Sequence, residues 1–156
     1  MAFFEYDTIL GNITMVETDG EITRLSLAFD ASCLQDERSE TRLIKEAYRQ
    51  LRAYFNGKLF EFALPLAPLG TDFMQSVWKA LREIPYGETV SYKDIAVRIG
   101  NPNASRAVGM ANNRNPIAIA IPCHRVIGSN GQLVGYRSGL ENKRMLLELE
   151  SRYVVR

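Results

Sequence analysis

The 156-residue sequence contains one histidine, two cysteines and one tryptophan, and these shortages exclude several classes of protein. Two cysteines are too few for a disulfide framework, and a reducing compartment would keep both as thiols. Together with one histidine they are also too few for a four-ligand zinc site, so no metal is expected. No apolar run approaches the roughly 18 residues that cross a bilayer. The first residues, M-A-F-F-E-Y-D, lack the basic flank and apolar core of a signal peptide, which predicts a cytoplasmic protein.

Charge is nearly balanced over the whole chain, at +1, but it is unevenly distributed. Residues 1–77 carry 7 Lys/Arg against 12 Asp/Glu, whereas residues 78–137 carry 8 against 3. A polyanionic partner is therefore expected to bind the second half of the chain. Chance asymmetry in a small protein is the alternative explanation.

The first 68 residues have the pattern of a small α/β domain. Two strands are expected within Asn12 to Leu27, joined by the hairpin turn Asp19-Gly20. Apolar side chains then follow helical spacing from about Glu40 to Phe55. A short strand is expected from Leu59 to Leu66, before a linker of prolines and glycine. We therefore predict an N-terminal α/β domain over residues 1–68, made of a small antiparallel sheet and a helix.

Residues 69–156 predict a mostly helical second domain. Thr71 is a good N-cap for a helix that stops near Pro85. Ser91 and Asp94 match a capping box that opens a helix through Ile99. A further helix is expected over residues 104–112, which makes the pair a candidate helix-turn-helix of a winged-helix-like domain. The remaining expectations are a buried strand over 117–121, a loop over 128–139, and a helix over 140–151 with Leu140, Leu146 and Leu147 inward.

The second helix of this pair is unusually rich in small residues. Arg106 is the only long side chain in its first two turns, among Ala, Ser, Val and Gly. A helix that reads the major groove normally presents several Arg, Asn or Gln side chains to base edges. A surface of small side chains instead favours close approach to a narrow minor groove. Close packing against a neighbouring helix would explain the same composition.

The stretch I-A-I-A-I-P-C-H-R-V-I-G places Cys123 beside His124, the only histidine. A cysteine nucleophile needs a base or a lowered pKa, and His124 is the only imidazole available. Pro122 favours a turn there, since neighbouring side chains on a regular strand point to opposite faces. Glu148 or Glu150 on the last helix is a candidate to orient the histidine. A small buried thiol with a satisfied polar neighbour is the simpler alternative.

The motif around Cys123 resembles the signature of the O6-alkylguanine-DNA alkyltransferases, the methylated-DNA–protein-cysteine methyltransferases. The resemblance runs from about Phe73 to Glu150, half of the chain, whereas the first 68 residues match only in length and element order. The segments that carry it are Pro122–Val126, Tyr86-Gly87 to Ser91-Tyr92, Gly100–Pro102, Arg106–Gly109, Asn115-Pro116, Gly135-Tyr136 and Lys143–Glu150.

The resemblance implies direct repair of double-stranded DNA containing O6-alkylguanine, and of O4-alkylthymine, by base flipping and stoichiometric alkyl transfer to a cysteine. It needs no cofactor, because the alkyl donor is the lesion, and a stable thioether inactivates the molecule after one turnover. A monomer is expected. The implied catalytic residues are Cys123 as nucleophile, His124 as base, Glu150 orienting it, Tyr92 donating to guanine, and Asn115 tying the helix pair to the active turn. The implied DNA contacts are Tyr92, Lys93, Asn101, Arg106, which enters the base stack, and Ser129.

Three departures from the family pattern affect these expectations. The substrate pocket would be lined by Tyr136, Arg137 and Ser138, where the family usually has a small residue and two glycines after the tyrosine. The range of accepted alkyl groups is therefore open. Leu149 stands where a histidine often precedes the glutamate, and the zinc ligands that some relatives carry are missing.

Three alternatives to alkyl transfer are a damaged-base-binding protein, a helix-turn-helix regulator and a cysteine hydrolase. Relatives that bind damaged bases without transfer replace the cysteine that is present here. A helix-turn-helix regulator would need an additional DNA-binding domain. A cysteine hydrolase usually draws its histidine from elsewhere in the chain, and there is no second histidine.

Overall fold

The computed structural model describes residues 1–155, which form two compact units. The first comprises Met1–Leu69 together with Pro116–Ala118, and the second comprises residues 70–115 and those from 119 onward. The chain therefore returns to the first unit for three residues in the middle of the second. No helix of the described chain is long and apolar enough to cross a membrane.

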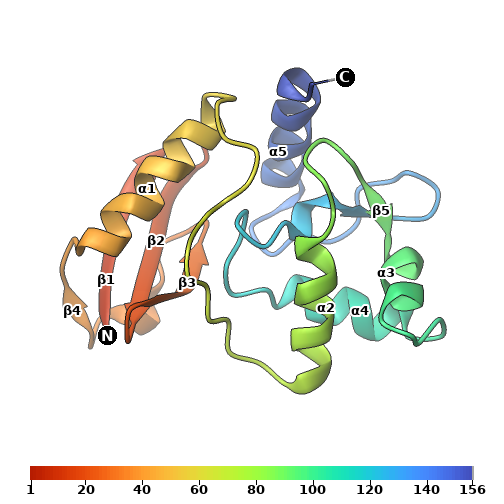
Figure 1. The fold of residues 1–156 in the computed structure, drawn as a ribbon, viewed down its shortest axis with the longest axis horizontal. Helices are drawn as coiled ribbons and strands as arrows, with labels where there is room; N and C mark the ends of the chain where they lie inside the picture. The colour runs from red at the N-terminus through yellow and green to blue at the C-terminus, as the bar shows by residue number, and fades with distance from the viewer. Residues whose placement is uncertain (156) are drawn as a thin grey trace. The chain divides into compact units, whose positions relative to one another are not determined.

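The first unit is a four-stranded sheet with one long helix packed against it (Figure 1). Its strands are β1 (Ala2–Thr8), β2 (Gly11–Thr18), β3 (Glu21–Ser26) and β4 (Glu37–Arg38), in the order β3-β2-β1-β4. The predicted hairpin is confirmed. Asp19 and Gly20 both have positive φ, as a two-residue turn between twisted strands requires. The sheet is mixed rather than antiparallel, because β4 pairs parallel with β1.

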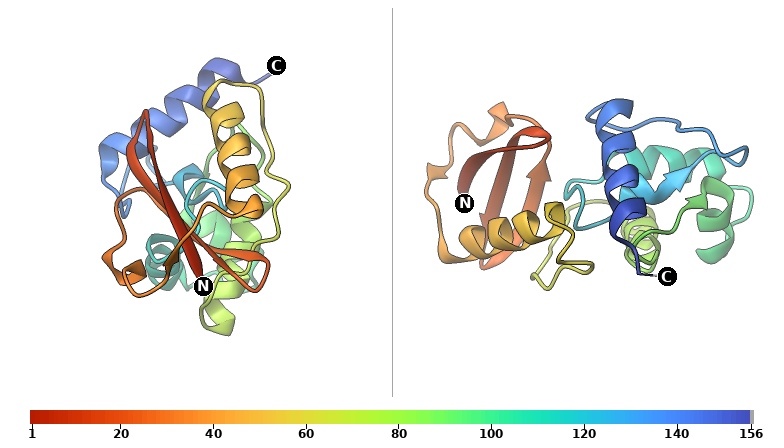
Figure 2. Two further views of the ribbon diagram at one scale, coloured as in Figure 1. Left: turned by 90° about the vertical axis from the view of Figure 1, so that its left-hand side faces the viewer. Right: turned by 90° about the horizontal axis from the view of Figure 1, so that it is seen from above.

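Helix α1 (Arg42–Phe55) begins at its N-cap Thr41, whose hydroxyl accepts a hydrogen bond from the Ile44 amide at 3.1 Å. Its apolar face contacts β2 and β3, and Figure 2 shows it lying along the sheet. Ile44, Ala47 and Leu51 are fully or almost fully buried there. A single turn of 3-10 helix, η1 (Ala31–Cys33), follows β3.

Two predicted strands do not form. Over residues 59–66 only Leu66 makes a bridge, to Ile22, because the Gln50 side chain bonds both backbone groups of Ala63. Over residues 117–121 there is no strand but only isolated bridge residues, Ile117, Ala118 and Ile121, of which Ile117 pairs with Leu25. The ladder stops at Ile119, whose φ of 70° is a strained value for a β-branched residue.

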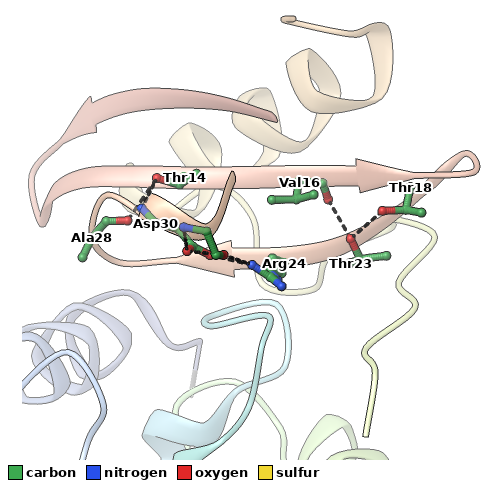
Figure 3. Close-up of polar contacts among 8 residues, drawn as sticks. Thr14, Val16, Thr18, Thr23, Arg24, Ala28 and Asp30 are labelled. Atoms are coloured by element: carbon green, nitrogen blue, oxygen red, sulfur yellow. Dashed lines mark hydrogen bonds and ion pairs between the residues drawn. The ribbon is translucent and has the colours of Figure 1, made fainter. Parts of the chain in front are cut away.

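Polar contacts close the loop after β3 (Figure 3). The Thr14 hydroxyl donates to the Ala28 carbonyl at 3.0 Å and accepts from the Asp30 amide at 3.3 Å. The Asp30 carboxylate pairs with Arg24 at 3.0 Å. Because the Arg24 and Asp30 side chains are partly exposed, this pair contributes little to stability and mainly fixes the loop.

In its described residues, which end at 155, the second unit contains four α-helices, one turn of 3-10 helix and a two-stranded parallel sheet. Thr71 and the Ser91–Asp94 capping box start the first two helices as predicted. Trp78 donates its ring N–H to the Ala111 carbonyl at 2.9 Å and so joins two of the helices. The elements are α2 (Asp72–Arg82), β5 (Val90–Ser91), α3 (Tyr92–Arg98), α4 (Ser105–Asn113), η2 (Cys123–Arg125), β6 (Val126–Ile127) and α5 (Leu140–Tyr153).

The predicted inward face of α5 is partly wrong. Leu146 is buried, whereas Leu140 is 47% exposed at the first position of the helix. The buried stripe continues instead through Lys143, Leu149 and Glu150, so that two charged side chains point into the unit. This arrangement brings the last helix to the Cys123 turn, with which it is in contact.

Candidate active site

Cys123 and His124 lie on a tight turn rather than on a strand. Residues Cys123–Arg125 form one turn of 3-10 helix directly after Pro122. The Arg125 amide donates to the Pro122 carbonyl at 3.1 Å, which fixes the curvature of the turn. The thiol residue is 5% exposed and the histidine is fully buried. The two reactive side chains are therefore both shielded from solvent in the described chain.

Glu150 reaches this turn from α5. Its Oε2 lies 2.6 Å from Nε2 of His124, and Arg125 donates to both oxygens at 2.8 and 3.0 Å. The Gly87 amide donates to Oε1 at 3.1 Å. Glu148, the other carboxylate considered from the sequence, is exposed and pairs with Arg144. Of the two candidates, Glu150 is the one placed beside the imidazole.

These contacts set the ionisation of the pair. Burial alone raises the pKa of Glu150, but the hydrogen bonds and charges of His124 and Arg125 outweigh it and hold the pKa far below its usual range. Burial lowers the pKa of His124 below its ordinary value, although Glu150 opposes this shift. The pair is thus a carboxylate beside a neutral imidazole at neutral pH. Nε2 then carries the ring hydrogen toward Glu150, which leaves the buried Nδ1 lone pair free to accept a proton.

The surroundings of Cys123 have opposing effects on the pKa of its thiol. Burial raises its pKa, whereas contacts with Asn115 and Tyr136 and the charge of Lys143 favour the thiolate. Asn115 donates to the Ile121 carbonyl at 2.8 Å, and Asn112 on α4 donates to the Cys123 carbonyl at 3.3 Å. The turn is therefore connected to the end of α4 by two buried amides. Since burial dominates, the resting group is a thiol that needs a base.

Lys143 is fully buried and holds the loop before Tyr136. Its ammonium donates to the carbonyls of Val134 at 3.0 Å and Gly135 at 3.2 Å. The Tyr92 hydroxyl donates to the same Val134 carbonyl at 2.7 Å. Burial lowers the pKa of Lys143 to about 8. One carbonyl oxygen thus links Tyr92 on α3 to Lys143 on α5.

The remaining residues proposed from the sequence lie outside this buried cluster. Arg137 is exposed, and Ser138 accepts a hydrogen bond from Asn142 at 3.2 Å. Gly109 on α4 lies beside Tyr92, and a Cβ added at Gly109 would be in ordinary van der Waals contact with the Tyr92 ring. Four of the five candidate DNA contacts are exposed, and the fifth, Tyr92, is only partly exposed. The exposed four are Lys93 on α3, Asn101 in the turn after it, Arg106 on α4 and Ser129 in the loop after β6.

Three buried residues of the site were not proposed from the sequence: Asn112, Arg125 and Lys143. A signal existed for Lys143, because it lies three residues before Leu146 on the predicted helix and so shares its face. Arg125 follows the Cys-His pair directly, but nothing in its spacing distinguishes an inward arginine from a solvated one. Within residues 1–155 no group of three or more His, Cys, Asp or Glu side chains is arranged to hold a metal ion.

Comparison with known proteins covers both units. Residues 72–152 match the family model described as 6-O-methylguanine DNA methyltransferase, DNA binding domain, and residues 4–68 match its ribonuclease-like domain. A methylated-DNA–protein-cysteine methyltransferase of Methanosarcina barkeri is 70% identical over 109 residues, 70% of this chain and 69% of the relative. One of Mycobacterium leprae is 49% identical over 150 residues, 96% of this chain and 85% of the relative.

Solved structures give the same result. The crystal structure of Mycobacterium tuberculosis OGT in complex with DNA has a TM-score of 0.92 at 46% identity, covering 98% of this chain and 94% of that one. That of the M. tuberculosis O6-methylguanine methyltransferase has a TM-score of 0.91 at 45% identity, covering 99% and 94%. With a buried cysteine, its histidine and a carboxylate set on this fold, the chain belongs to the 6-O-methylguanine DNA methyltransferase family.

Proposed function

We propose that this protein repairs double-stranded DNA by moving the alkyl group of O6-alkylguanine, and of O4-alkylthymine, directly to Cys123. The observation that carries the proposal is the buried Cys123 next to a His124–Glu150 pair separated by 2.6 Å. Relatives named methylated-DNA–protein-cysteine methyltransferases support it. The alternative is a protein that binds damaged bases, or regulates through its helix pair, without transferring anything.

The transfer is an in-line displacement. Sγ of Cys123 forms a bond to the alkyl carbon as the bond from that carbon to the guanine oxygen breaks, and the electron pair of the broken bond leaves with the guanine. The thiol proton passes through a water to Nδ1 of His124, whose imidazolium the Glu150 carboxylate stabilises. Tyr92 breaks its hydrogen bond to the Val134 carbonyl and donates its hydroxyl proton to the departing guanine. The imidazolium then returns a proton to the Tyr92 oxygen through solvent.

Access to the base requires flipping, since the reacting oxygen lies inside the duplex. Flipping costs a few kcal/mol and costs least for a damaged, poorly paired base. Exposed Arg106 on α4 enters the stack from the minor groove and fills the vacated place. Lys93, Asn101 and Ser129 contact the DNA backbone, while Asn115 ties the helix pair to the active turn. Tyr136, Arg137 and Ser138 line the alkyl pocket.

The remaining features follow from the same chemistry. No cofactor takes part, because the lesion supplies the alkyl group, and the thioether has no easy exit, so each molecule acts once. Residues 69–156 form the domain that binds DNA and performs the transfer, and residues 1–68 support it. We further propose that the protein acts as a monomer in the cytoplasm.

The test is the intact mass of the protein after mixing with a duplex containing one O6-methylguanine. We expect the mass to rise by one methyl group, to saturate at one per molecule, and to stay unchanged in Cys123→Ser. Cys33→Ser is the matched control, because Cys33 is also a buried free thiol and should not affect the gain. An unchanged mass with tight binding of the lesion duplex would establish the non-transferring alternative.

A second variant tests the flipping role. Arg106→Ala should slow transfer from duplex DNA while Cys123 keeps its reactivity toward a small alkylating reagent. A transfer rate equal to that of the parent protein would remove Arg106 from the mechanism.

A further inference from the structure

One exposed stripe of helix α1 in the first unit carries cations only. Residues three or four apart lie on the same face of a helix, and the four cations of α1 follow this spacing. All four are exposed: Arg42, Lys45, Arg49 and Arg52. At 3.6 residues per turn they fall within about 80° of one another, opposite the face that packs on the sheet. These four residues are called the cationic stripe below.

The stripe is unfavourable for the free protein. Like charges three or four residues apart on a helix repel one another, and the stripe contains three such neighbouring pairs. Arg42 also lies in the first turn of α1, where the helix dipole disfavours a cation and no acidic residue is present. Glu40, two residues earlier, already accepts a hydrogen bond from the Tyr6 hydroxyl at 2.6 Å.

The distribution of charge in the first unit sets the stripe apart. Residues 1–69 carry 7 Lys/Arg against 11 Asp/Glu, so that four of the seven cations of an acidic unit gather on one side of one helix. A mixed surface would place acidic residues among them and gain stability from the pairs. Repulsion without such pairs indicates that an external anion completes this surface.

Three of the four cations have no carboxylate partner within residues 1–155, and only Arg49 is paired. Its Nε donates to Glu46 at 2.8 Å. The guanidinium of Arg52 lies 5.8 Å from the ring centroid of Tyr48, a contact that holds the side chain without neutralising its charge. The remaining positive charge is therefore available to a partner.

The form of the stripe favours a phosphate backbone over an acidic protein. An interface between proteins usually has an apolar core, whereas α1 has no exposed large apolar side chain. The stripe extends over ten residues of helix, about 15 Å, and one strand of a duplex presents about four phosphates over that length. Three of its four members are arginines, whose planar forks match phosphate oxygens.

We propose that the cationic stripe of α1 is a second DNA-contacting surface, which binds the phosphate backbone of a duplex in addition to the contacts made by the helix pair. The inference rests on the proposed function in one respect, that DNA is the macromolecule on which the protein acts. Phosphate contacts carry no sequence information. The stripe thus adds affinity for lesion-free and damaged duplex alike, and holds the protein on DNA while it searches for a lesion.

The experiment measures affinity for a lesion-free duplex as a function of salt concentration. The variant combines Arg42→Gln, Lys45→Gln and Arg52→Gln, because glutamine keeps a long side chain and a good helix propensity. We expect about tenfold weaker binding near physiological salt. The slope of log affinity against log salt should fall in magnitude by about 2 to 3, since three phosphate contacts are lost. A slope equal to that of the parent protein would overturn the proposal.

The matched control removes three cations from the same unit outside α1, by combining Arg24→Gln, Arg38→Gln and Lys58→Gln. All three residues are exposed, so the net charge changes equally in the two variants. The slope of the control should fall by less than one. An equal fall in both variants would show that net charge alone sets the affinity. Loss of binding to polyglutamate with unchanged duplex affinity in the stripe variant would assign the stripe to an acidic protein. Either result would overturn the proposal.

Folding of the stripe variant is checked by its urea midpoint, which should not fall, because the substitutions remove repulsion between like charges. Lys45→Gln alone, which changes one side chain, should lower the slope by about one and provides the same test with the smallest change to the helix. A slope unchanged in this variant and in the triple variant would remove the stripe from DNA binding.

The two proposals fail separately. Absence of alkylated Cys123 in the parent protein would remove the transfer function, whereas binding to a lesion-free duplex judges the stripe without any transfer. At saturating lesion duplex the stripe variant should still gain one methyl group per molecule, because its substitutions lie outside the unit that holds the thiol turn. Loss of that gain at saturation would contradict a role confined to DNA affinity.

Discussion

The two units of this protein bury different kinds of side chain. In the first unit the buried side chains are apolar apart from Thr14 and Gln50, and the ion pairs lie at the surface. In the second, His124, Arg125, Lys143 and Glu150 are all almost completely buried. Burying a charge costs free energy, and attraction to an opposite charge offsets this cost only where the geometry of the pair is good. Prepositioned charge is useful to a reaction, and the buried charges of residues 1–155 all belong to the unit that holds the candidate nucleophile.

Replacing Glu150 should have the largest effect. In Glu150→Gln the imidazole loses its carboxylate and Arg125 is left as a buried cation without a partner charge. We expect transfer to slow by about 100-fold or more. The free energy of unfolding should fall by about 3 kcal/mol. Single-turnover transfer and urea unfolding measure the two effects. Glu148→Gln, on the exposed side of the same helix, should change neither, and equal behaviour of the two variants would contradict the assignment.

Acid should destabilise the second unit through the same pair. The folded-state pKa values of both His124 and Glu150 lie below their ordinary values, so the unfolded chain binds protons more readily. The stability that this pair contributes is therefore fully present above about pH 6.5. Part of it is lost as the pH falls below that value, where the histidine of the unfolded chain takes up a proton, and a further part is lost below about pH 4.5, where the glutamate does the same. We expect a loss of about 1 kcal/mol or more between pH 7 and pH 4.

Urea midpoints measured across this range give the result. In Glu150→Gln the loss below about pH 4.5 should shrink, since the carboxylate responsible for it is gone. A midpoint in the parent protein that stays constant from pH 7 to pH 4 would show that the buried pair is not linked to folding.

Lys143→Met should have an intermediate effect. The carbonyls of Val134 and Gly135 lose their donor, the loop before Tyr136 loosens, and transfer should slow by about tenfold. Because the pKa of Lys143 is lowered to about 8, stability of the parent protein should rise with pH between about 8 and 10.4. This rise should be absent in the variant and present in Lys79→Met, an exposed control on α2. A rise that persists in Lys143→Met would contradict the assigned pKa.

The smallest effect is expected in the first unit. Arg38 pairs with Glu5 at 2.8 Å on the surface of the sheet, and both side chains are partly exposed. Arg38→Ala should cost less than about 1 kcal/mol of unfolding free energy, and transfer should be unchanged. Differential scanning calorimetry and the mass assay would measure these quantities. A loss comparable to that of Glu150→Gln would erase the contrast between the two units.

Local rules predicted more of the fold than of the site. The caps at Thr71 and Ser91 and the turn Asp19-Gly20 depend on neighbours within four residues, and all three formed. The strands predicted at 59–66 and 117–121 needed distant partners, and side-chain contacts or a strained residue replaced the ladder there. Apolar content alone cannot distinguish a strand from an extended buried segment.

In the site, too, features that depend on sequence neighbours were predicted, and features that depend on distant partners were not. The Cys-His pair and its position after Pro122 were visible in the sequence, because they are adjacent. The role of Arg125 was not, since its partner lies 25 residues away and its burial depends on that contact. Lys143 shares the predicted face of Leu146, but a lysine on a predicted helix is ordinarily assigned to solvent.

The three residues Pro116–Ala118 belong to the first unit, although they precede the active turn by only a few residues in the chain. The Leu25 amide donates to the Pro116 carbonyl at 2.9 Å, and the Ala118 amide donates to the Leu25 carbonyl at 3.0 Å. These bonds end five residues before the nucleophile, and Pro116 directly follows Asn115. Amide hydrogen exchange at Leu25 and Ala118 therefore reports the opening of this segment. Measuring the exchange rates of these amides before and after alkylation would show whether alkylation of Cys123 changes local opening in the sheet of the first unit.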